Sequence, residues 1–184
     1  MPTIDCNAKE ALIRFAAAGP PGAGKTQVLW KLHAGLPREI RTDLMMKPIG
    51  ADQIVSFDFT PAALVPVADY KARCRLVTVP GRIAEPGIFQ RVMGEIDGIL
   101  FVVDSQCERL GENADALRQL AAIRGIAEVP VVILYNKRDL PNAAPVAALD
   151  RLLNRAGAPW FETVATKGEG LGAALSELFR IVVG

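Results

Sequence analysis

The sequence predicts an α/β protein in which a mostly parallel, six-stranded sheet with one antiparallel strand is covered by helices on both faces. Three observations lead to this prediction. Strand patterns alternate with helical patterns along the chain. Several strands are continuous apolar runs, as expected for strands that are buried on both faces. A glycine-rich loop joins the first strand to the first helix.

The individual elements are placed by apolar periodicity and by the Gly and Pro residues between them. Strands are expected at residues 12–18, 54–59, 74–79, 99–103, 129–135 and 161–165. Helices are expected at residues 27–32, 88–93, 113–123, 146–155 and 171–182. The second and third strands are joined by a short connection and should form an antiparallel hairpin. Residues 33–53 carry several Gly and Pro residues and are expected to form a long functional loop.

Size and composition favour one domain over residues 1–184, because a chain of this length can bury a substantial core. The net charge is +1 and no basic stretch is dense, so a nucleic-acid partner is not expected. No run resembles a signal peptide, a membrane span or a lipidation motif, so we expect no membrane anchor and a cytoplasmic location. Three widely spaced cysteines fit the thiols of a reduced compartment.

The loop after the first strand matches the phosphate-binding pattern Gly-x-x-x-x-Gly-Lys-Ser/Thr, from Gly19 to Thr26. Its glycines allow successive backbone N–H groups to point at an anion, and the next helix directs its positive end to the same place. Lys25 would reach the β- and γ-phosphates, and the Thr26 hydroxyl would hold Mg²⁺. An ordinary Gly/Pro-rich turn is the alternative, which the flanking strand and helix disfavour.

A second motif selects the base. Asn136-Lys137-Arg138-Asp139 follows an apolar strand, where Asp139 can accept hydrogen bonds from N1–H and the exocyclic amine of guanine. Adenine does not offer this pattern, so the discrimination is large. Asn136 would tie this loop to the phosphate loop, and the Lys137 stem would cover one face of the base. The alternative is an ordinary charged turn.

Together these motifs resemble those of the Ras-like small GTPases, and within them the chain is similar to the bacterial MglA family of polarity and gliding-motility GTPases. The resemblance covers nearly the whole chain. The stretches that carry it are Gly19-Pro20, Phe57-Asp58-Phe59, Thr78-Val79-Pro80-Gly81, Asp97-Gly98, Phe101-Val102-Val103-Asp104-Ser105 and Tyr135-Asn136-Lys137-Arg138-Asp139-Leu140-Pro141-Asn142.

The resemblance implies a small G-domain of the P-loop NTPase type that binds GTP or GDP with Mg²⁺. It also implies a roadblock-type activating or regulatory partner and effectors of polarity and motility. By the same resemblance, the Ala165 N–H would bind the guanine O6. The nucleotide-binding residues would be Gly19, Gly22, Ala23, Gly24, Lys25, Thr26, Gln27, Gly81, Asn136, Lys137, Asp139, Val164, Ala165 and Thr166, with Thr26 as the metal ligand.

Some positions tied to GTP hydrolysis depart from the Ras-like pattern. Thr78 stands where most small GTPases have an aspartate that helps to hold Mg²⁺ through water, and the MglA family shares this threonine. Asp58 on the neighbouring strand could compensate electrostatically, or it could be an ordinary strand carboxylate. Arg82 stands where the family has the glutamine that orients the attacking water. A guanidinium cannot accept a hydrogen bond from water, although it could stabilise charge on the γ-phosphate.

In the first switch region, Gln53 falls where the MglA family has an arginine finger, and Ile54 falls where a threonine contacts Mg²⁺. The catalytic candidates are therefore Lys25, Arg82 and Gln53, and we expect slow unaided GTP hydrolysis. Arg82 and Gln53 could also have exchanged roles.

Three functions are consistent with these motifs. The first is a switch GTPase, in which the loops at residues 33–53 and 82–87 reorganise with the γ-phosphate. The second is a pseudo-GTPase scaffold that binds guanine nucleotide constitutively and acts as an interaction subunit. The third is a P-loop protein that uses ATP.

Overall fold

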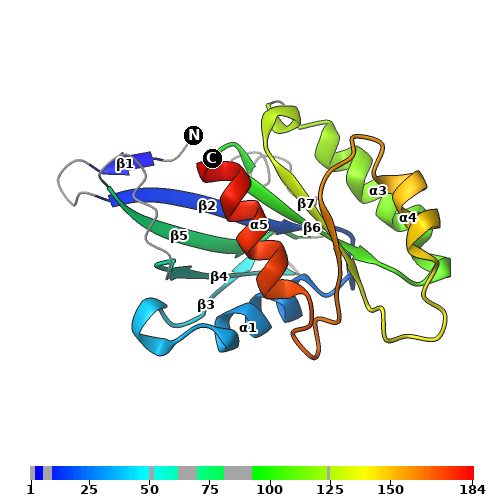
Figure 1. The fold of residues 1–184 in the computed structure, drawn as a ribbon, viewed down its shortest axis with the longest axis horizontal. Helices are drawn as coiled ribbons and strands as arrows, with labels where there is room; N and C mark the ends of the chain where they lie inside the picture. The colour runs from blue at the N-terminus through cyan, green and yellow to red at the C-terminus, as the bar shows by residue number, and fades with distance from the viewer. Residues whose placement is uncertain (1–2, 6–9, 50–51, 62–69, 81–92, 124) are drawn as a thin grey trace.

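The computed structural model describes residues 3–5, 10–49, 52–61, 70–80, 93–123 and 125–184. Within them, eight strands form one sheet in the order β3-β4-β5-β2-β6-β7-β8, with β1 beside β2 (Figure 1). The strands are β1 (Thr3–Asp5), β2 (Glu10–Ala18), β3 (Met45–Ile49), β4 (Asp52–Phe59), β5 (Lys71–Thr78), β6 (Gly98–Asp104), β7 (Val131–Asn136) and β8 (Trp160–Glu162). The helices are α1 (Lys25–Gly35), α3 (Leu110–Ala121), α4 (Val146–Leu153) and α5 (Leu171–Val183).

The sheet is mostly parallel. Strands β5, β2, β6, β7 and β8 run parallel to one another, whereas β4 is antiparallel to both β3 and β5. The predicted fold class and the predicted hairpin are therefore confirmed. The sheet has two strands more than the six predicted, because β1 and β3 add antiparallel partners to β2 and β4.

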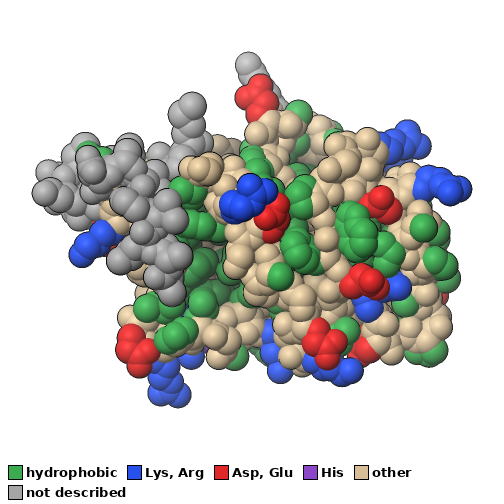
Figure 2. Space-filling view, viewed as in Figure 1, with side chains coloured by type: hydrophobic (Ala, Val, Ile, Leu, Met, Phe, Trp, Pro, Cys, Tyr) green, Lys and Arg blue, Asp and Glu red, His purple; other side chains and the backbone are tan. Residues whose placement is uncertain are grey.

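Helices cover both faces of the sheet. Alternate residues of β2 point to opposite faces, and they enter two separate cores. Ile13 and Phe15 pack with apolar residues of α1 and α5, whereas Ala16 and Ala18 pack with those of α3 and α4. Figure 1 shows α5 crossing the near face of the sheet. On this face, basic and acidic side chains are interspersed (Figure 2). Because β2, β6 and β7 are parallel, their carboxyl ends meet at one edge, where ligands bind in such sheets.

The prediction of one long loop at residues 33–53 is wrong. Helix α1 continues to Gly35, a 3-10 turn follows at Arg38–Ile40, and β3 occupies Met45–Ile49. Pro48 is a turn signal in the sequence, yet it lies in β3. Since β3 is an edge strand, a proline there can leave its missing N–H on the open side of the sheet. Residues 88–92 of the helix expected at 88–93 are outside the described part of the chain.

Asp58 is held by two arginines on the β4–β5 hairpin. Its carboxylate accepts hydrogen bonds from Arg75 Nε at 2.7 Å and from Arg73 Nη2 at 2.9 Å, and the residue is only 7% exposed. Burial alone would raise the pKa of Asp58, but the hydrogen bonds and charges of Arg75 and Arg73 outweigh burial and hold the pKa below its usual value. Asp58 therefore serves the hairpin as a structural carboxylate.

We expect Asp58→Asn to lower the free energy of unfolding at pH 7 by about 1–3 kcal/mol, because the variant removes the charge that the two arginines share. The lowered folded-state pKa means that the carboxylate's contribution is complete above its unfolded pKa of roughly 4 and is lost as the pH falls through the folded pKa. Urea unfolding should therefore show the largest difference at pH 7 and a smaller one at pH 3. Asp115→Asn is the matched control, since the Asp115–Arg118 pair is exposed and should contribute under about 1 kcal/mol. A difference for Asp58→Asn that grows toward pH 3 would contradict this account.

Candidate functional site

The predicted phosphate loop lies at the carboxyl end of β2, and its backbone conformation requires glycine. Gly19, Gly22 and Gly24 have φ angles of 140°, 76° and 103°, a region that other residues rarely adopt. A Cβ on Gly19 would lie 2.2 Å from the carbonyl oxygen of Val102 on β6. A Cβ on Gly24 would lie 2.6 Å from Asn136 Nδ2. Glycine at these two positions therefore leaves the space into which the backbone of Val102 and the side chain of Asn136 approach the loop.

The loop has the features of an anion cradle. Lys25 Nζ donates hydrogen bonds to the carbonyl oxygens of Gly19 (3.0 Å) and Pro20 (2.9 Å), so the ammonium lies over the loop. Helix α1 starts at Lys25 and has no side-chain cap, because its N-cap residue is Gly24. The amides of its first turn are therefore not occupied by a capping side chain, and the dipole of the helix favours an anion there.

Asn136 joins three segments of the site. Its Nδ2 donates to the carbonyl oxygen of Ala23 in the phosphate loop at 2.8 Å. Its Oδ1 accepts from the Ala165 N–H at 2.9 Å and from Thr163 Oγ1 at 3.3 Å, and the residue is buried. The prediction that Asn136 ties its loop to the phosphate loop is confirmed.

The same contact involves the amide of Ala165. Its N–H, predicted to bind the guanine O6, donates to Asn136 in this structure. The next two amides, of Lys167 and Gly168, donate to the carbonyl oxygen of Val164. Among the hydrogen bonds of the described residues, none is donated by the Thr166 N–H, so this amide remains available at the turn.

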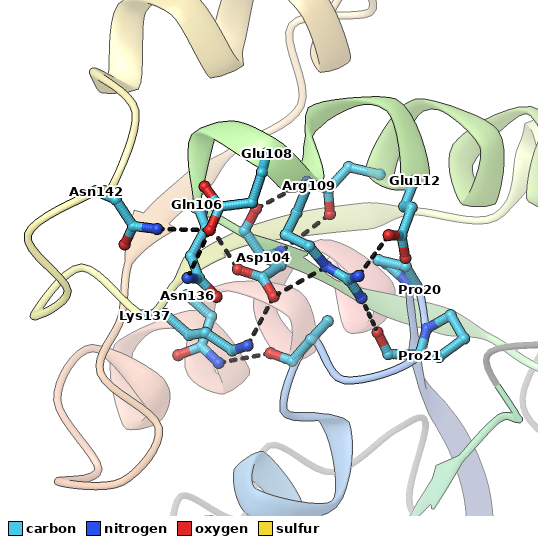
Figure 3. Close-up of polar contacts among 12 residues, drawn as sticks. Pro20, Pro21, Asp104, Gln106, Glu108, Arg109, Glu112, Asn136, Lys137 and Asn142 are labelled. Carbon is cyan, nitrogen blue, oxygen red and sulfur yellow. Dashed lines mark hydrogen bonds and ion pairs between the residues drawn. The ribbon is translucent and has the colours of Figure 1, made fainter.

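Lys137 and Asp139 lie at the end of the site where the sequence predicts base binding. Lys137 has a φ of 64°, and its Nζ donates to Asp104 Oδ2 at 2.6 Å (Figure 3). Asp139 is exposed, and in the part of the chain that the structure describes its carboxylate has no hydrogen bond or ion pair. An exposed carboxylate beside an anchored lysine fits a receptor for the two N–H donors of guanine.

Two contributors were missed by the sequence analysis. Asp104 was named only within the stretch Phe101–Ser105 that carries the resemblance and was given no role, yet its carboxylate is 1% exposed and accepts the Lys137 ammonium. Arg109 was not singled out, yet it donates to the carbonyl oxygen of Pro21 in the phosphate loop. The position of Asp104 at the end of β6 is a signal that could have identified it, whereas no local pattern identifies Arg109.

Thr78 and Asp58, which the sequence analysis related to Mg²⁺ binding, make their side-chain contacts within the β4–β5 hairpin. Thr78 is buried, and its Oγ1 accepts the N–H of Val55 at 2.8 Å, which ties β5 to β4. Asp58 is the cross-strand partner of Arg75, so the two side chains point to the same face of the sheet. Thr78 lies three residues after Arg75 on β5 and therefore points to the other face. The hypothesis that Asp58 compensates for Thr78 is therefore wrong.

Gln53 and Ile54 lie within β4, where they are paired with Pro48 and Lys47 of β3. Their strand is two positions from β2 in the sheet, a lateral distance of about 10 Å. The Gln53 side chain is exposed. Gly81 and Arg82 are outside the described residues.

The described residues contain no group of three or more His, Cys, Asp or Glu side chains placed to hold a metal. Mg²⁺ bound to phosphates does not need such a group, since it takes few protein ligands and completes its shell with phosphate oxygens and water; the Thr26 hydroxyl at the start of α1 fits that role. No described helix is sufficiently long and apolar to cross a membrane.

Known proteins match the chain over this site and beyond it. The model of the ADP-ribosylation factor family matches residues 81–182. The mutual gliding-motility protein MglA of Myxococcus xanthus is 32% identical over 188 aligned residues, which cover 100% of this chain and 96% of that protein. ADP-ribosylation factor-like protein 1 of Drosophila melanogaster is 28% identical over 174 residues, which cover 90% of this chain and 87% of that protein.

Proposed function

Because the chain belongs to the Arf/Ras-like small GTPases, we propose that it is an MglA-type switch that binds GDP and GTP at the carboxyl edge of its sheet. The observation that carries this proposal is the Asn136 side chain, which holds the phosphate loop, the base-reading loop and the turn at residues 163–165 together. A site assembled in this way can grip the two ends of one nucleotide.

In this proposal, different residues bind the phosphates, the metal and the base. Lys25 leaves the carbonyl oxygens of Gly19 and Pro20 to bind the β- and γ-phosphates, beside the amides of the loop and of the first turn of α1. The Thr26 hydroxyl is the protein ligand for Mg²⁺, which supplies charge neutralisation at the phosphates. Asp139 accepts the N1–H and amine of guanine, and the Thr166 N–H donates to O6.

We further propose that unaided GTP hydrolysis is slow. The Thr78 hydroxyl accepts a hydrogen bond from Val55 of the neighbouring strand, and Gln53 lies in a strand two positions from β2. Arg82 occupies the position of the water-orienting glutamine and cannot accept a proton or a hydrogen bond. Groups that orient water or neutralise the transition state contribute orders of magnitude in rate.

Single-turnover GTP hydrolysis tests this proposal. We expect Arg82→Ala to hydrolyse GTP within a few-fold of the native rate, and Arg82→Gln to be faster by about tenfold, because the amide can orient water. Calorimetric titration with GDP is measured first on each protein, so that a loss of binding is not mistaken for a loss of catalysis. A much slower Arg82→Ala variant with native GDP affinity would show that Arg82 is catalytic and would reject the slow-enzyme proposal.

The second candidate is a pseudo-GTPase scaffold, which the same arrangement of Thr78, Gln53 and Arg82 favours.

By resemblance, the partners are a roadblock-type regulator and effectors of polarity or motility, and the location is cytoplasmic. Partner affinity measured with GDP and with a non-hydrolysable GTP analogue separates the two candidates. A switch should bind its regulator differently in the two states, whereas a scaffold should bind it equally.

A further inference from the structure

Arg109 connects the start of α3 to the phosphate loop (Figure 3). Its Nη2 donates to the carbonyl oxygen of Pro21 at 2.9 Å, across 88 positions in the sequence. Its Nη1 donates to Glu112, and its Nε lies 3.7 Å from Asp104 Oδ2. One guanidinium therefore faces the main chain of the phosphate loop and two carboxylates at the same time.

Asp104 joins this guanidinium to the base-reading loop. The same Oδ2 that faces Arg109 accepts Lys137 Nζ at 2.6 Å. Because Asp104 is 1% exposed, its carboxylate has lost most of its contact with water, and neighbouring cations of the protein offset the cost of burying it. The carboxylate thus lies between Lys137 of the base-reading loop and Arg109, which contacts the phosphate loop through Pro21.

The turn that carries Arg109 is held by its own hydrogen bonds. The Gln106 N–H donates to Asp104 Oδ1 at 3.2 Å, and the Arg109 N–H donates to the Gln106 carbonyl oxygen at 3.0 Å. Asn113, which is fully buried, binds both the N–H and the carbonyl oxygen of Asp104, at 3.0 and 2.8 Å. Arg109 therefore starts from a well-defined backbone position.

The contact with Pro21 determines where one amide of the phosphate loop points. In a trans peptide unit the C=O and the following N–H point in opposite directions, and none of the described peptide bonds is cis. Holding the Pro21 carbonyl outward, toward Arg109, therefore directs the Gly22 N–H to the opposite side. The guanidinium also lies across Gly22, since a Cβ there would be 3.6 Å from Arg109 Nη2.

We propose that Arg109 is a positioning residue for nucleotide retention: it orients the Pro21–Gly22 peptide toward the phosphates and, through Asp104 and Lys137, couples the phosphate loop to the base-reading loop. Release of GDP requires these loops to separate from the nucleotide, and the coupling makes them open together. This inference rests on the proposed guanine-nucleotide site.

Dissociation of GDP with a fluorescent N-methylanthraniloyl group on its ribose, chased by excess unlabelled GDP, tests the proposal on the full chain. We expect Arg109→Ala to release this GDP about tenfold faster, which corresponds to one charge-assisted hydrogen bond, with an association rate within about twofold of native. Arg109→Lys should give an intermediate rate, because an ammonium keeps the charge but not the rigid fork. Arg118→Ala is the matched control, because Arg118 lies in α3 and its ion pair with Asp115 is exposed; this variant should release GDP at the native rate.

Asp104→Asn tests the coupling, because it keeps the shape of the side chain and removes the charge shared by Arg109 and Lys137. We expect GDP release at least as fast as in Arg109→Ala, and a native rate would overturn the coupling. Native release by Arg109→Ala, or full rescue by Arg109→Lys, would overturn the positioning role. Thermal unfolding of each nucleotide-free protein identifies variants that fail to fold. If Asp104→Asn fails to fold, the release rates of Arg109→Ala and Arg109→Lys decide the proposal. If the native chain takes up no labelled GDP, the proposed function fails instead.

Discussion

Asp139→Ala should lower the affinity for GDP by about a hundredfold or more. The variant removes the acceptor of two hydrogen bonds from guanine, and each hydrogen bond to a charged group contributes roughly 1.5–3 kcal/mol. The fold should be unaffected, since Asp139 is exposed and its carboxylate has no partner among the described residues. Isothermal titration calorimetry with GDP measures the loss, and thermal unfolding of the nucleotide-free protein measures the fold.

Asp139→Asn gives a sharper version of the same test. The asparagine amide can donate a hydrogen bond where the carboxylate only accepts, so it opposes the guanine amine and suits a base with a carbonyl oxygen at that position. We therefore expect the variant to lose GDP and to gain xanthosine diphosphate, with a combined change in preference of roughly a hundredfold or more.

The matched control is Asp115→Asn, which changes an exposed carboxylate on α3 and should keep the native preference. Native GDP affinity in Asp139→Ala would contradict the assignment of this residue. A native chain that prefers ADP to GDP would instead favour the ATP-using alternative.

Gly24→Ala should abolish measurable GDP binding and destabilise the protein by roughly 2–6 kcal/mol. Its φ of 103° is strained for any residue with a Cβ, which costs about 1–3 kcal/mol. The new Cβ would lie 2.6 Å from Asn136 Nδ2. Asn136 would have to move away from Ala23, which breaks a buried hydrogen bond at a further cost of about 1–3 kcal/mol. Urea unfolding without nucleotide and calorimetry with GDP measure the two effects.

Gly35→Ala is the control for this substitution. Gly35 ends α1, and a Cβ there would meet nothing within 4 Å. We expect this variant to bind GDP normally and to be within about 1 kcal/mol of the native stability. A Gly24→Ala protein with native GDP affinity would show that the close approach of Asn136 to the loop is not required.

The features that the sequence predicted well are local ones. The phosphate loop needs glycine at Gly19 and Gly24 for reasons of backbone geometry, so the pattern is visible in a short segment. The fold class follows from strands and helices that alternate along the chain. The tie from Asn136 to the phosphate loop spans 113 positions, yet it was predicted because each of its ends belongs to a recognisable motif.

Other features depended on neighbours that no local pattern specifies. Pro48 indicates a loop in the sequence, but the edge position of β3 allows it in a strand. The sequence offered Asp58 two roles, and the ladder opposite Arg75 decided between them. The Ala165 amide was assigned to the nucleotide, although Asn136 Oδ1 lies within hydrogen-bond distance of it.

By itself, the sequence determined the class of fold, the proposed phosphate cradle and the acid proposed to read the base, because each depends on backbone conformation or on chemistry within a few consecutive residues. Tertiary structure alone decided which side chains meet across the site. Arg109 reaches Pro21, and Lys137 shares Asp104 with it, only because β2, β6 and β7 are adjacent and end at the same edge of the sheet. Contacts of this kind depend on strand order and packing, which act between segments that are distant in the chain.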